Sequence, residues 1–237
     1  MNINKSDSYF KFSSFGLSNL ANKSLAKVRK DVFTKFKDES KFLETDSILD
    51  VGVSAQDHPT SNFFEQYYPY KNNLTALGLG DFKELEALYP GITYVQGNGS
   101  ELPFESSSFD WIFSHAVIEH VGNNKNRISF IKELLRVSKK GVILTTPNRL
   151  HPLEFHTGLP LIHYFPKYIH RFVYNILGKK FYAKEENLNL FTPKEIRNIV
   201  SKTIVEENLD GLVRIKLAYT YWLGLPSNII VVLNKTN

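Results

Sequence analysis

The feature that most constrains this chain is the stretch of residues 109–121. A strongly apolar run ends on Ser114 and His115, and Glu119 and His120 follow within the next five residues. This pattern predicts a buried strand whose end delivers polar and titratable side chains into a loop ahead of a helix. Ligands of open α/β sheets bind in the crevice at the carboxyl ends of the strands. The stretch therefore predicts a functional site at that edge of a sheet.

The rest of the chain alternates between short apolar runs and segments of helical spacing. We expect strands at residues 47–53, 73–79, 92–96, 109–114, 141–146, 213–219 and 229–233. We expect helices at residues 22–36, 61–67, 82–88, 126–137 and 193–201. Strands that alternate with helices imply parallel pairing and right-handed crossovers. The last two strands follow one another directly, across a loop expected at residues 224–227.

Composition bounds the class of protein. The 237 residues suit one α/β domain better than two, and 42% hydrophobic residues are enough for a sizeable core. The absence of cysteine excludes disulfides, zinc–thiolate sites and thiol nucleophiles. Neither a signal-peptide pattern nor an apolar run of about 20 residues is present, which predicts a soluble, cytoplasmic protein. We expect an N-terminal segment and helix over residues 1–40, then one domain over 41–237 with an insertion at about 147–190.

The net charge of +5 is concentrated in two segments. Residues 1–40 hold eight Lys or Arg against four Asp or Glu, and residues 155–184 hold five basic and no acidic side chains. Such segments attract phosphate-bearing substrates, anionic lipid or nucleic acid, or they only keep the surface soluble. Residues 167–183 have the pattern of a basic amphipathic helix, which either makes peripheral contact with a membrane or packs on its own domain.

Small or polar residues follow three of the expected strands. These are Asp50, Gly52 and Ser54 after the first, Gly78 and Asp81 after the second, and Asn98 and Gly99 after the third. Each group also admits a purely structural interpretation: a turn at Gly52, a helix N-cap at Asp81 and an Asn–Gly turn at Asn98.

Residues 47–146 resemble the core of the class I S-adenosylmethionine-dependent methyltransferases, in the type 11-like subgroup. The likeness rests on Asp50 and Gly52, on Leu-Pro-Phe at 102–104, on the aspartate-led strand at 109–114 and on Glu-His-Val at 119–121. It implies a doubly wound, mostly parallel, seven-stranded Rossmann-like α/β sheet with an antiparallel last strand. It also implies S-adenosylmethionine as the cofactor and methyl transfer as the reaction.

The resemblance assigns cofactor-binding roles to residues of this chain. Asp50, Gly52 and Ser54 hold the methionine end, Gly78 and Asp81 border the ribose, Asn98 and Gly99 meet the adenine, and Ser114 lines the methyl side. Val53, Gly78 and Asn98 depart from the residues that the family usually has there. Two hypotheses therefore stay open: an active methyltransferase, and a non-catalytic binding or scaffold protein with the same fold.

Histidine is the expected general base. A hydroxyl acceptor must lose its proton during methyl transfer, and histidine titrates near neutral pH. His120 is the first candidate and His156 the second. The alternative for His120 is a structural role, in which it caps the helix or packs beside the cofactor.

The insertion follows a strand that ends at the crevice, so we expect it to form a wall of the acceptor pocket. Its substrate-binding candidates are Asn148, Arg149, His151 and Glu154, with Arg149 as an anion clamp. His151 is a further candidate for the base in this pocket. Two alternatives stay open: a folded loop whose histidines satisfy its own backbone, and a metal site of His and Glu. The spacing of these residues matches no metal motif, so no metal ligand is assigned.

The continuation of the chain resembles a bacterial subset of these enzymes associated with cell-surface polysaccharide synthesis. The likeness is carried by Thr-Thr-Pro-Asn-Arg at 145–149, Glu-Phe-His-Thr at 154–157 and Glu-Asn-Leu-Asn-Leu at 186–190. It implies a small-molecule or glycan acceptor that is methylated on oxygen. Nucleic acid is not expected as a partner, because the Asn/Asp-Pro-Pro-aromatic motif and an appended nucleic-acid-binding module are both absent.

Overall fold

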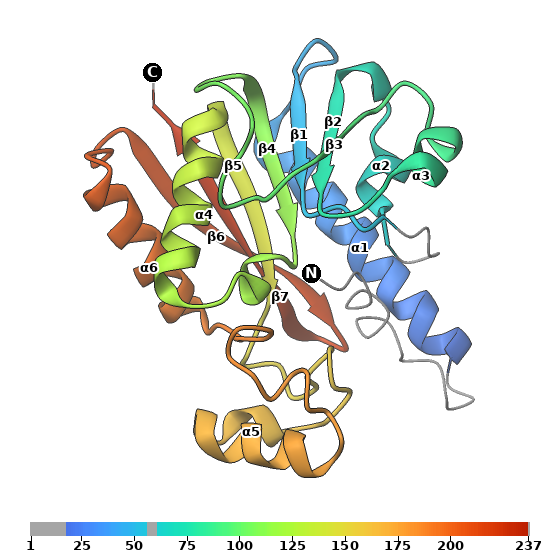
Figure 1. Ribbon diagram of the computed structural model, residues 1–237, viewed down its shortest axis with the longest axis vertical. Helices are drawn as coiled ribbons and strands as arrows, with labels where there is room; N and C mark the ends of the chain where they lie inside the picture. The colour runs from blue at the N-terminus through green and yellow to red at the C-terminus, as the bar shows by residue number, and fades with distance from the viewer. Residues whose placement is uncertain (1–17, 56–60, 237) are drawn as a thin grey trace.

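A seven-stranded sheet carries the fold in this computed structural model, which describes residues 18–55 and 61–236 (Figure 1). Its strands are β1 (Ile48–Val51), β2 (Leu74–Gly78), β3 (Thr93–Gln96), β4 (Phe109–His115), β5 (Ser138–Pro147), β6 (Val213–Trp222) and β7 (Leu225–Lys235). The strand order is β3-β2-β1-β4-β5-β7-β6, and β7 runs antiparallel to the other six strands. This confirms the predicted Rossmann-like fold, and it brings the carboxyl ends of β1 and β4 side by side.

In the described part of the chain, six α-helices connect or flank the strands. They are α1 (Ser18–Ser40), α2 (Phe63–Tyr67), α3 (Lys83–Leu88), α4 (Asn124–Val137), α5 (Lys167–Ile176) and α6 (Pro193–Glu206). The start of α6 is fixed by a capping box between Thr192 and Glu195, with Pro193 in the first turn. The helices expected from periodicity all form, with bounds shifted by a few residues.

The alternation of side chains along the strands builds a core on each face of the sheet. On one face, Leu49 and Ile112 pack with α4 and α6. On the other, Ile48 and Phe113 pack with α1 and α2, where Phe36 of α1 is fully buried. Because both faces are covered, only the strand ends are left to form a site.

Two local predictions were wrong. The basic amphipathic helix expected over 167–183 ends at Ile176, because Gly178 follows with a φ of 75° and stops the helix. The loop expected at 224–227 is a tighter turn, and Pro226 lies inside β7 next to a register shift between Thr220 and Tyr221. Neither change alters the order of the strands.

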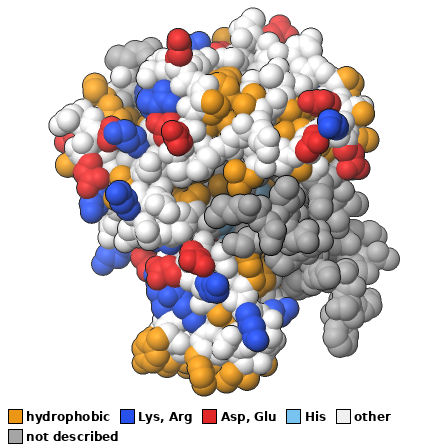
Figure 2. Space-filling view, in the orientation of Figure 1, with side chains coloured by type: hydrophobic (Ala, Val, Ile, Leu, Met, Phe, Trp, Pro, Cys, Tyr) orange, Lys and Arg blue, Asp and Glu red, His pale blue; other side chains and the backbone are white. Residues whose placement is uncertain are grey.

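Residues 147–190 form a separate lobe beyond the carboxyl end of β5, with α5 at its far side (Figure 1). Its own small core contains Tyr174, Tyr182, Leu188 and Leu190. The outer surface of α5 is apolar, and Figure 2 shows hydrophobic side chains at the tip of the lobe with Lys and Arg above them. Among the described residues, no helix is both long enough and apolar enough to cross a membrane.

Candidate active site

The chain turns sharply at Gly52, directly after β1. Gly52 has a φ of 106°, and its amide donates to the Leu77 carbonyl of β2 at 2.7 Å. A Cβ at this position would lie 2.1 Å from Cγ2 of Val117, so only glycine fits against the loop that follows β4. Ser54 lies partly exposed two residues further on. The backbone thus runs close to the end of β4, where the crevice was predicted.

Two buried carboxyl groups lie near each other at this end of the sheet, Asp50 on β1 and Glu65 on α2. Burial raises the pKa of Asp50 well above its ordinary value, and the charge of Glu65 raises it further. Burial also raises the pKa of Glu65 to about 7, although a backbone hydrogen bond and the charge of Lys71 oppose the effect. Oε1 of Glu65 has no hydrogen-bond partner. A cationic ligand group would supply a hydrogen-bond donor to this oxygen and a positive charge beside the two carboxyl groups.

A largely buried cation lies on α1, within electrostatic reach of Tyr67 and His115. Nη1 of Arg29 is buried without a hydrogen-bond partner, and burial lowers the pKa of Arg29 to about 10. His115, at the end of β4, has Nδ1 2.6 Å from Oγ1 of Thr145, and its ring packs edge-on against Phe63. Burial lowers the pKa of His115 to about 3, and the charge of Arg29 lowers it further, so this histidine is neutral. Arg29 is therefore the charged group here, with one nitrogen available to an anion.

The side of the crevice where the nucleoside is expected has fewer described side-chain groups that could bind a ligand than the side near Asp50 and Glu65. A Cβ at Gly78 would lie 2.2 Å from the Val53 carbonyl oxygen, so no side chain fits there. Asp81 is exposed, accepts from the Lys83 amide at 3.2 Å and pairs with the Lys83 ammonium at 3.3 Å. The Asp81 carboxyl thus holds the start of α3.

Asn98 and Gly99 form a tight turn after β3. Oδ1 of Asn98 accepts from the Ser100 amide at 3.0 Å, and the side chain is exposed. A Cβ at Gly99 would lie 2.6 Å from the ring of Phe130 on α4, so glycine is required for packing. These contacts fit the structural interpretation of the Asn–Gly pair and leave its adenine-binding role a prediction.

Ser114 joins the ends of β4 and β1. It is buried, and its hydroxyl donates to the Val51 carbonyl at 2.9 Å. The bond holds the two strand ends together at the crevice. A role at the methyl side of the cofactor stays a prediction, because the hydroxyl proton is already used.

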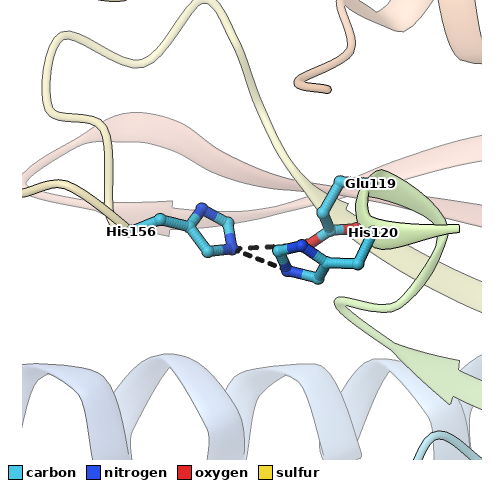
Figure 3. A group of neighbouring side chains, drawn as sticks. All are labelled: Glu119, His120 and His156. Atoms are coloured by element: carbon cyan, nitrogen blue, oxygen red, sulfur yellow. Dashed lines mark hydrogen bonds and ion pairs between the residues drawn. The ribbon is translucent and has the colours of Figure 1, made fainter. Parts of the chain in front are cut away.

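The short 3₁₀ turn after β4 (Ile118–His120) carries the predicted base (Figure 3). Nδ1 of His120 lies 2.5 Å from the Asn187 carbonyl oxygen, and its Nε2 lies 3.2 Å from Nε2 of His156. Burial lowers the pKa of His120 to about 3, and the charge of His156 lowers it further. The segment Glu186–Leu190 singled out in the sequence therefore meets the Glu-His pair directly.

Glu119 is fully buried beside this histidine pair. Its Oε2 accepts from the Thr146 hydroxyl at 2.9 Å, and its Oε1 has no hydrogen-bond partner. Burial raises the pKa of Glu119 to about 7, against the opposing charge of His156. Glu119 belongs to the Glu-His-Val motif at 119–121, and the sequence predicts no separate role for it.

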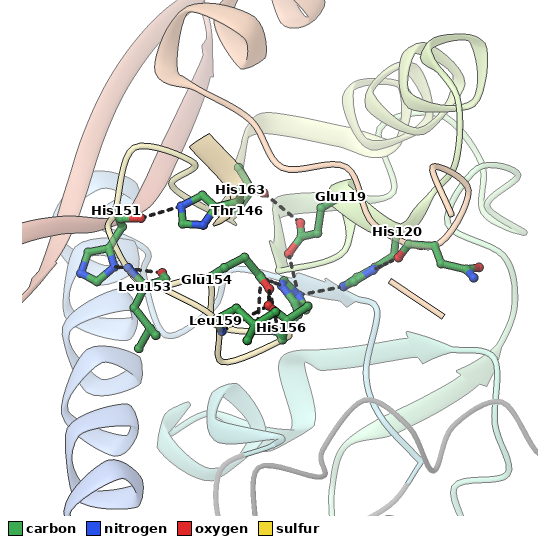
Figure 4. A network of polar contacts seen from close by, with 11 residues as sticks. Glu119, His120, Thr146, His151, Leu153, Glu154, His156, Leu159 and His163 are labelled. Atoms are coloured by element: carbon green, nitrogen blue, oxygen red, sulfur yellow. Dashed lines mark hydrogen bonds and ion pairs between the residues drawn. The ribbon is translucent and has the colours of Figure 1, made fainter. Parts of the chain in front are cut away.

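Glu154 orients His156 from within the lobe (Figure 4). One carboxylate oxygen accepts from both the backbone amide and Nδ1 of His156 at 2.8 Å, and the other accepts from the Thr157 amide at 2.6 Å. Burial raises the pKa of Glu154, but the bonds from His156 and Thr157 outweigh it and bring the pKa to about 2. Burial lowers the pKa of His156, and Glu154 raises it by more, so the net shift is upward.

The other lobe candidates contact backbone groups of the lobe and of β7. The Asn148 amide donates to the Pro226 carbonyl at 3.0 Å, and Nε of Arg149 donates to the His163 carbonyl at 3.2 Å. Nδ1 of His151 accepts from the Leu153 amide at 3.2 Å, and its ring stacks on Phe155. Their polar atoms fix the shape of the lobe, as the structural interpretation of the insertion expects. Substrate binding by Asn148, Arg149 and His151 stays a prediction.

The structure thus brings together three of the predicted site residues, His120, His156 and Glu154, and adds Glu119 to them. The sequence does not single out Arg29 or Glu65, because each lies within an expected helix, where a charged side chain ordinarily faces solvent. Only the fold shows that they are buried and that each leaves a polar atom unpaired.

Comparison with known proteins gives one family match and a set of similar structures. Residues 63–146 match the family model described as a methyltransferase domain, and no curated protein matches the chain. An S-adenosylmethionine-dependent methyltransferase from Methanosarcina mazei is 19% identical, with a TM-score of 0.52 over 82% of this chain and 94% of that one. One from Aquifex aeolicus is 12% identical, with a TM-score of 0.55 over 90% and 98%. Magnesium protoporphyrin IX methyltransferase from Synechocystis PCC 6803, with bound S-adenosylhomocysteine, is 12% identical, with a TM-score of 0.57 over 97% and 92%.

The family match spans roughly a third of the chain, from α2 to β5. The match agrees with the predicted methyltransferase domain, enzyme class and S-adenosylmethionine cofactor. The similar structures, all below 20% identity, show the shared fold. The predicted link to polysaccharide synthesis stays a prediction.

Proposed function

We propose that this methyltransferase acts on an oxygen atom of a small-molecule or glycan acceptor, such as an intermediate of polysaccharide synthesis. The observation that carries the proposal is the buried cluster of Glu119, His120, Glu154 and His156 at the ends of β4 and β5. A hydroxyl acceptor has to lose a proton when it is methylated, and this cluster is able to take up positive charge. Nitrogen acceptors that are already uncharged and nucleophilic need no such group.

The amino-acid end of S-adenosylmethionine fits the unpaired atoms of the crevice. That end carries one carboxylate and one ammonium group. Nη1 of Arg29 is a buried donor without an acceptor, and Oε1 of Glu65 is a buried acceptor without a donor. Arg29 would bind the carboxylate and Glu65, with Asp50, the ammonium. When bound, the cofactor supplies a methyl group on a positively charged sulfur.

The nucleoside end would rest on backbone groups. Gly78, Asp81, Asn98 and Gly99 border this side, and no described carboxylate there is buried and unpaired. Gly52 and Ser54 bring the β1 backbone close to it. We therefore assign most of the cofactor-binding free energy to the amino-acid end.

His120 and His156 would act on the acceptor as a pair. Both Nδ1 atoms are occupied, by the Asn187 carbonyl and by Glu154, so a proton from the acceptor can go only to the facing Nε2 atoms. Glu154 stabilises the charge that appears on His156. Both rings keep part of their surface exposed, which gives an acceptor access. Asn148, Arg149 and His151 shape the wall of the pocket around it.

We further propose that the outer face of α5 rests on an anionic lipid surface. Tyr168, Phe172 and Ile176 lie along one side of α5 and are 74%, 65% and 66% exposed. The segment 155–184 has five basic and no acidic side chains, which complements anionic headgroups. An acceptor held at a membrane would then meet the lobe directly.

Vesicle co-sedimentation tests this contact. The protein should bind phosphatidylglycerol vesicles, and less so at high salt, but not phosphatidylcholine vesicles. Phe172→Ser should reduce binding, whereas Val205→Ser, at a 62% exposed position on α6, should not. Equal binding by both variants would contradict the proposed lipid contact.

Calorimetric titration with S-adenosylhomocysteine tests the enzyme proposal. One site per chain is expected, and no heat at millimolar ligand would favour the scaffold hypothesis. Incubation with S-adenosylmethionine and a panel of sugar and phenol acceptors then tests the acceptor class. We expect products heavier by one methyl group on oxygen, and methylation of amines alone would contradict it.

A further inference from the structure

The two Nε2 atoms of His120 and His156 face each other at 3.2 Å (Figure 3). At this distance, two lone pairs repel unless a proton or a cation lies between them. Nδ1 of His120 lies against a carbonyl oxygen, which only accepts, so this nitrogen carries a hydrogen. Nδ1 of His156 lies against Glu154, which already accepts from two backbone amides and is therefore a carboxylate. This nitrogen carries a hydrogen too. In the neutral rings both Nε2 atoms then present lone pairs to each other.

The Glu119 carboxyl group faces the same point as the two histidine nitrogens. Oε1 of Glu119 lies 3.9 Å from Nε2 of His156 and has no hydrogen-bond partner. The other oxygen of this carboxyl is fixed by the Thr146 hydroxyl. The Glu119 oxygen and the two histidine nitrogens all lie within 4.8 Å of one another. Three lone pairs thus converge on one point from two histidines and a carboxyl group.

We propose that Glu119, His120 and His156 bind a divalent transition-metal ion, with zinc as the best match. Two histidines and one glutamate form a known catalytic zinc ligand set, and bonds of about 2.0–2.1 Å place tetrahedral ligand atoms about 3.3 Å apart. The 3.2 Å between the Nε2 atoms fits this spacing, and a small shift of Glu119 completes it. This proposal assigns metal ligands where sequence spacing assigned none.

The surroundings of the three ligands have the pattern of a metal site. Metal-bound histidines almost always donate their second ring nitrogen to a carboxylate or a carbonyl group. Here Glu154 and the Asn187 carbonyl take those two roles. Sequence spacing could not predict the site, because Glu119 and His156 are separated by 36 residues and belong to different elements.

Three protein ligands leave a coordination position open. An acceptor hydroxyl at that position would lose its proton more readily, because a bound divalent ion lowers its pKa. This consequence rests on the proposed methyl transfer, whereas the metal site itself does not. With the ion bound, the two Nε2 atoms are ligands and no longer proton acceptors, so the ion replaces the metal-free histidine pair in activating the acceptor hydroxyl.

The test is metal binding by the untagged full-length chain, freed of metal with a chelator. Titration with Zn²⁺ should show one site per chain, and Co²⁺ should give the intense visible absorption of a tetrahedral complex. Glu119→Gln, which keeps an acceptor for Thr146, and His156→Gln should each weaken Zn²⁺ binding by at least 10-fold. His170→Gln is the matched control, because Nδ1 of His170 also lies against a backbone carbonyl, at 3.1 Å, but outside the cluster.

Absence of Zn²⁺ binding in the wild-type chain, or equal binding by Glu119→Gln and His170→Gln, would overturn the metal site. If His156→Gln does not fold, as judged by its thermal transition, Glu119→Gln decides alone. Titration of the same metal-free samples with S-adenosylhomocysteine separates this test from the proposed function. Cofactor binding without metal binding ends only the metal proposal, and metal binding without cofactor binding ends only the methyltransferase proposal.

Discussion

The crevice at β1 and the cluster beneath the lobe use polar side chains in different ways. At the crevice, the motif residues Ser114, Asp81 and Asn98 use their polar atoms on nearby backbone groups. Unpaired atoms there belong to Glu65 and Arg29, outside the motifs. In the cluster, Glu119 and the histidine pair turn toward each other and leave one oxygen unpaired. A buried polar atom without a partner costs free energy, so its persistence points to a missing ligand. Unpaired atoms therefore locate function better here than the motif residues do.

The largest expected effect comes from the cluster. His120→Ala should reduce turnover by on the order of 10²–10⁴-fold, because it removes the group that handles the acceptor proton. Binding of S-adenosylhomocysteine should be unchanged, since the amino-acid end of the cofactor is held by Arg29 and Glu65. His170→Ala should leave both quantities unaltered. Full turnover of His120→Ala would show that the cluster is structural.

The buried carboxyl pair at the crevice should appear in the pH dependence of stability. The pKa of Glu65 is about 7 in the folded protein and about 4.5 ordinarily, so ionisation favours the unfolded chain as pH rises through this window. Glu65→Gln should therefore gain stability over the wild type, by on the order of 2–3 kcal/mol between pH 4.5 and 7.

Urea unfolding at several pH values measures this difference, with exposed Glu84→Gln as the control. A constant difference across the range would mean that Glu65 has the same pKa in the folded and the unfolded chain. The crevice would then hold a partner for Glu65 that the described residues do not provide.

Most of the fold could be predicted from the sequence, because it depends on local periodicity and strand length. The apolar runs that become β1, β4 and β5 are recognisable one at a time, and their parallel order follows from the helices between them. The site could be predicted only in part. Contacts such as His120 with Asn187, 67 residues apart, depend on how the lobe folds back, and no local pattern encodes that.

A variant of Arg29 distinguishes binding of the amino-acid end of the cofactor from binding of its nucleoside end. Arg29→Gln should weaken S-adenosylhomocysteine binding roughly 10- to 100-fold, because a charged hydrogen bond is lost. It should not affect 5′-methylthioadenosine, which lacks the amino-acid group. Lys30→Gln, on the exposed side of the same helix, is the control. An equal loss for both ligands would place Arg29 at the nucleoside instead.

Asn98 should have the smallest effect. The sequence interpretation assigns its amide to the adenine, which predicts a loss of on the order of 1–3 kcal/mol in Asn98→Ala. The exposed side chain and its bond to the Ser100 amide predict less than about 1 kcal/mol, or roughly a fivefold change. Calorimetry with S-adenosylhomocysteine distinguishes these two expectations. A loss of binding free energy above about 1 kcal/mol would support the adenine contact.

A crystal structure with bound S-adenosylhomocysteine would decide whether the unpaired atoms of Arg29, Glu65 and Glu119 belong to one continuous site. We expect the ligand carboxylate on Arg29, its ammonium at Glu65, and its sulfur facing His120 and His156. A ligand bound away from Arg29 and Glu65, or with its sulfur shielded from the histidine pair, would contradict this expectation.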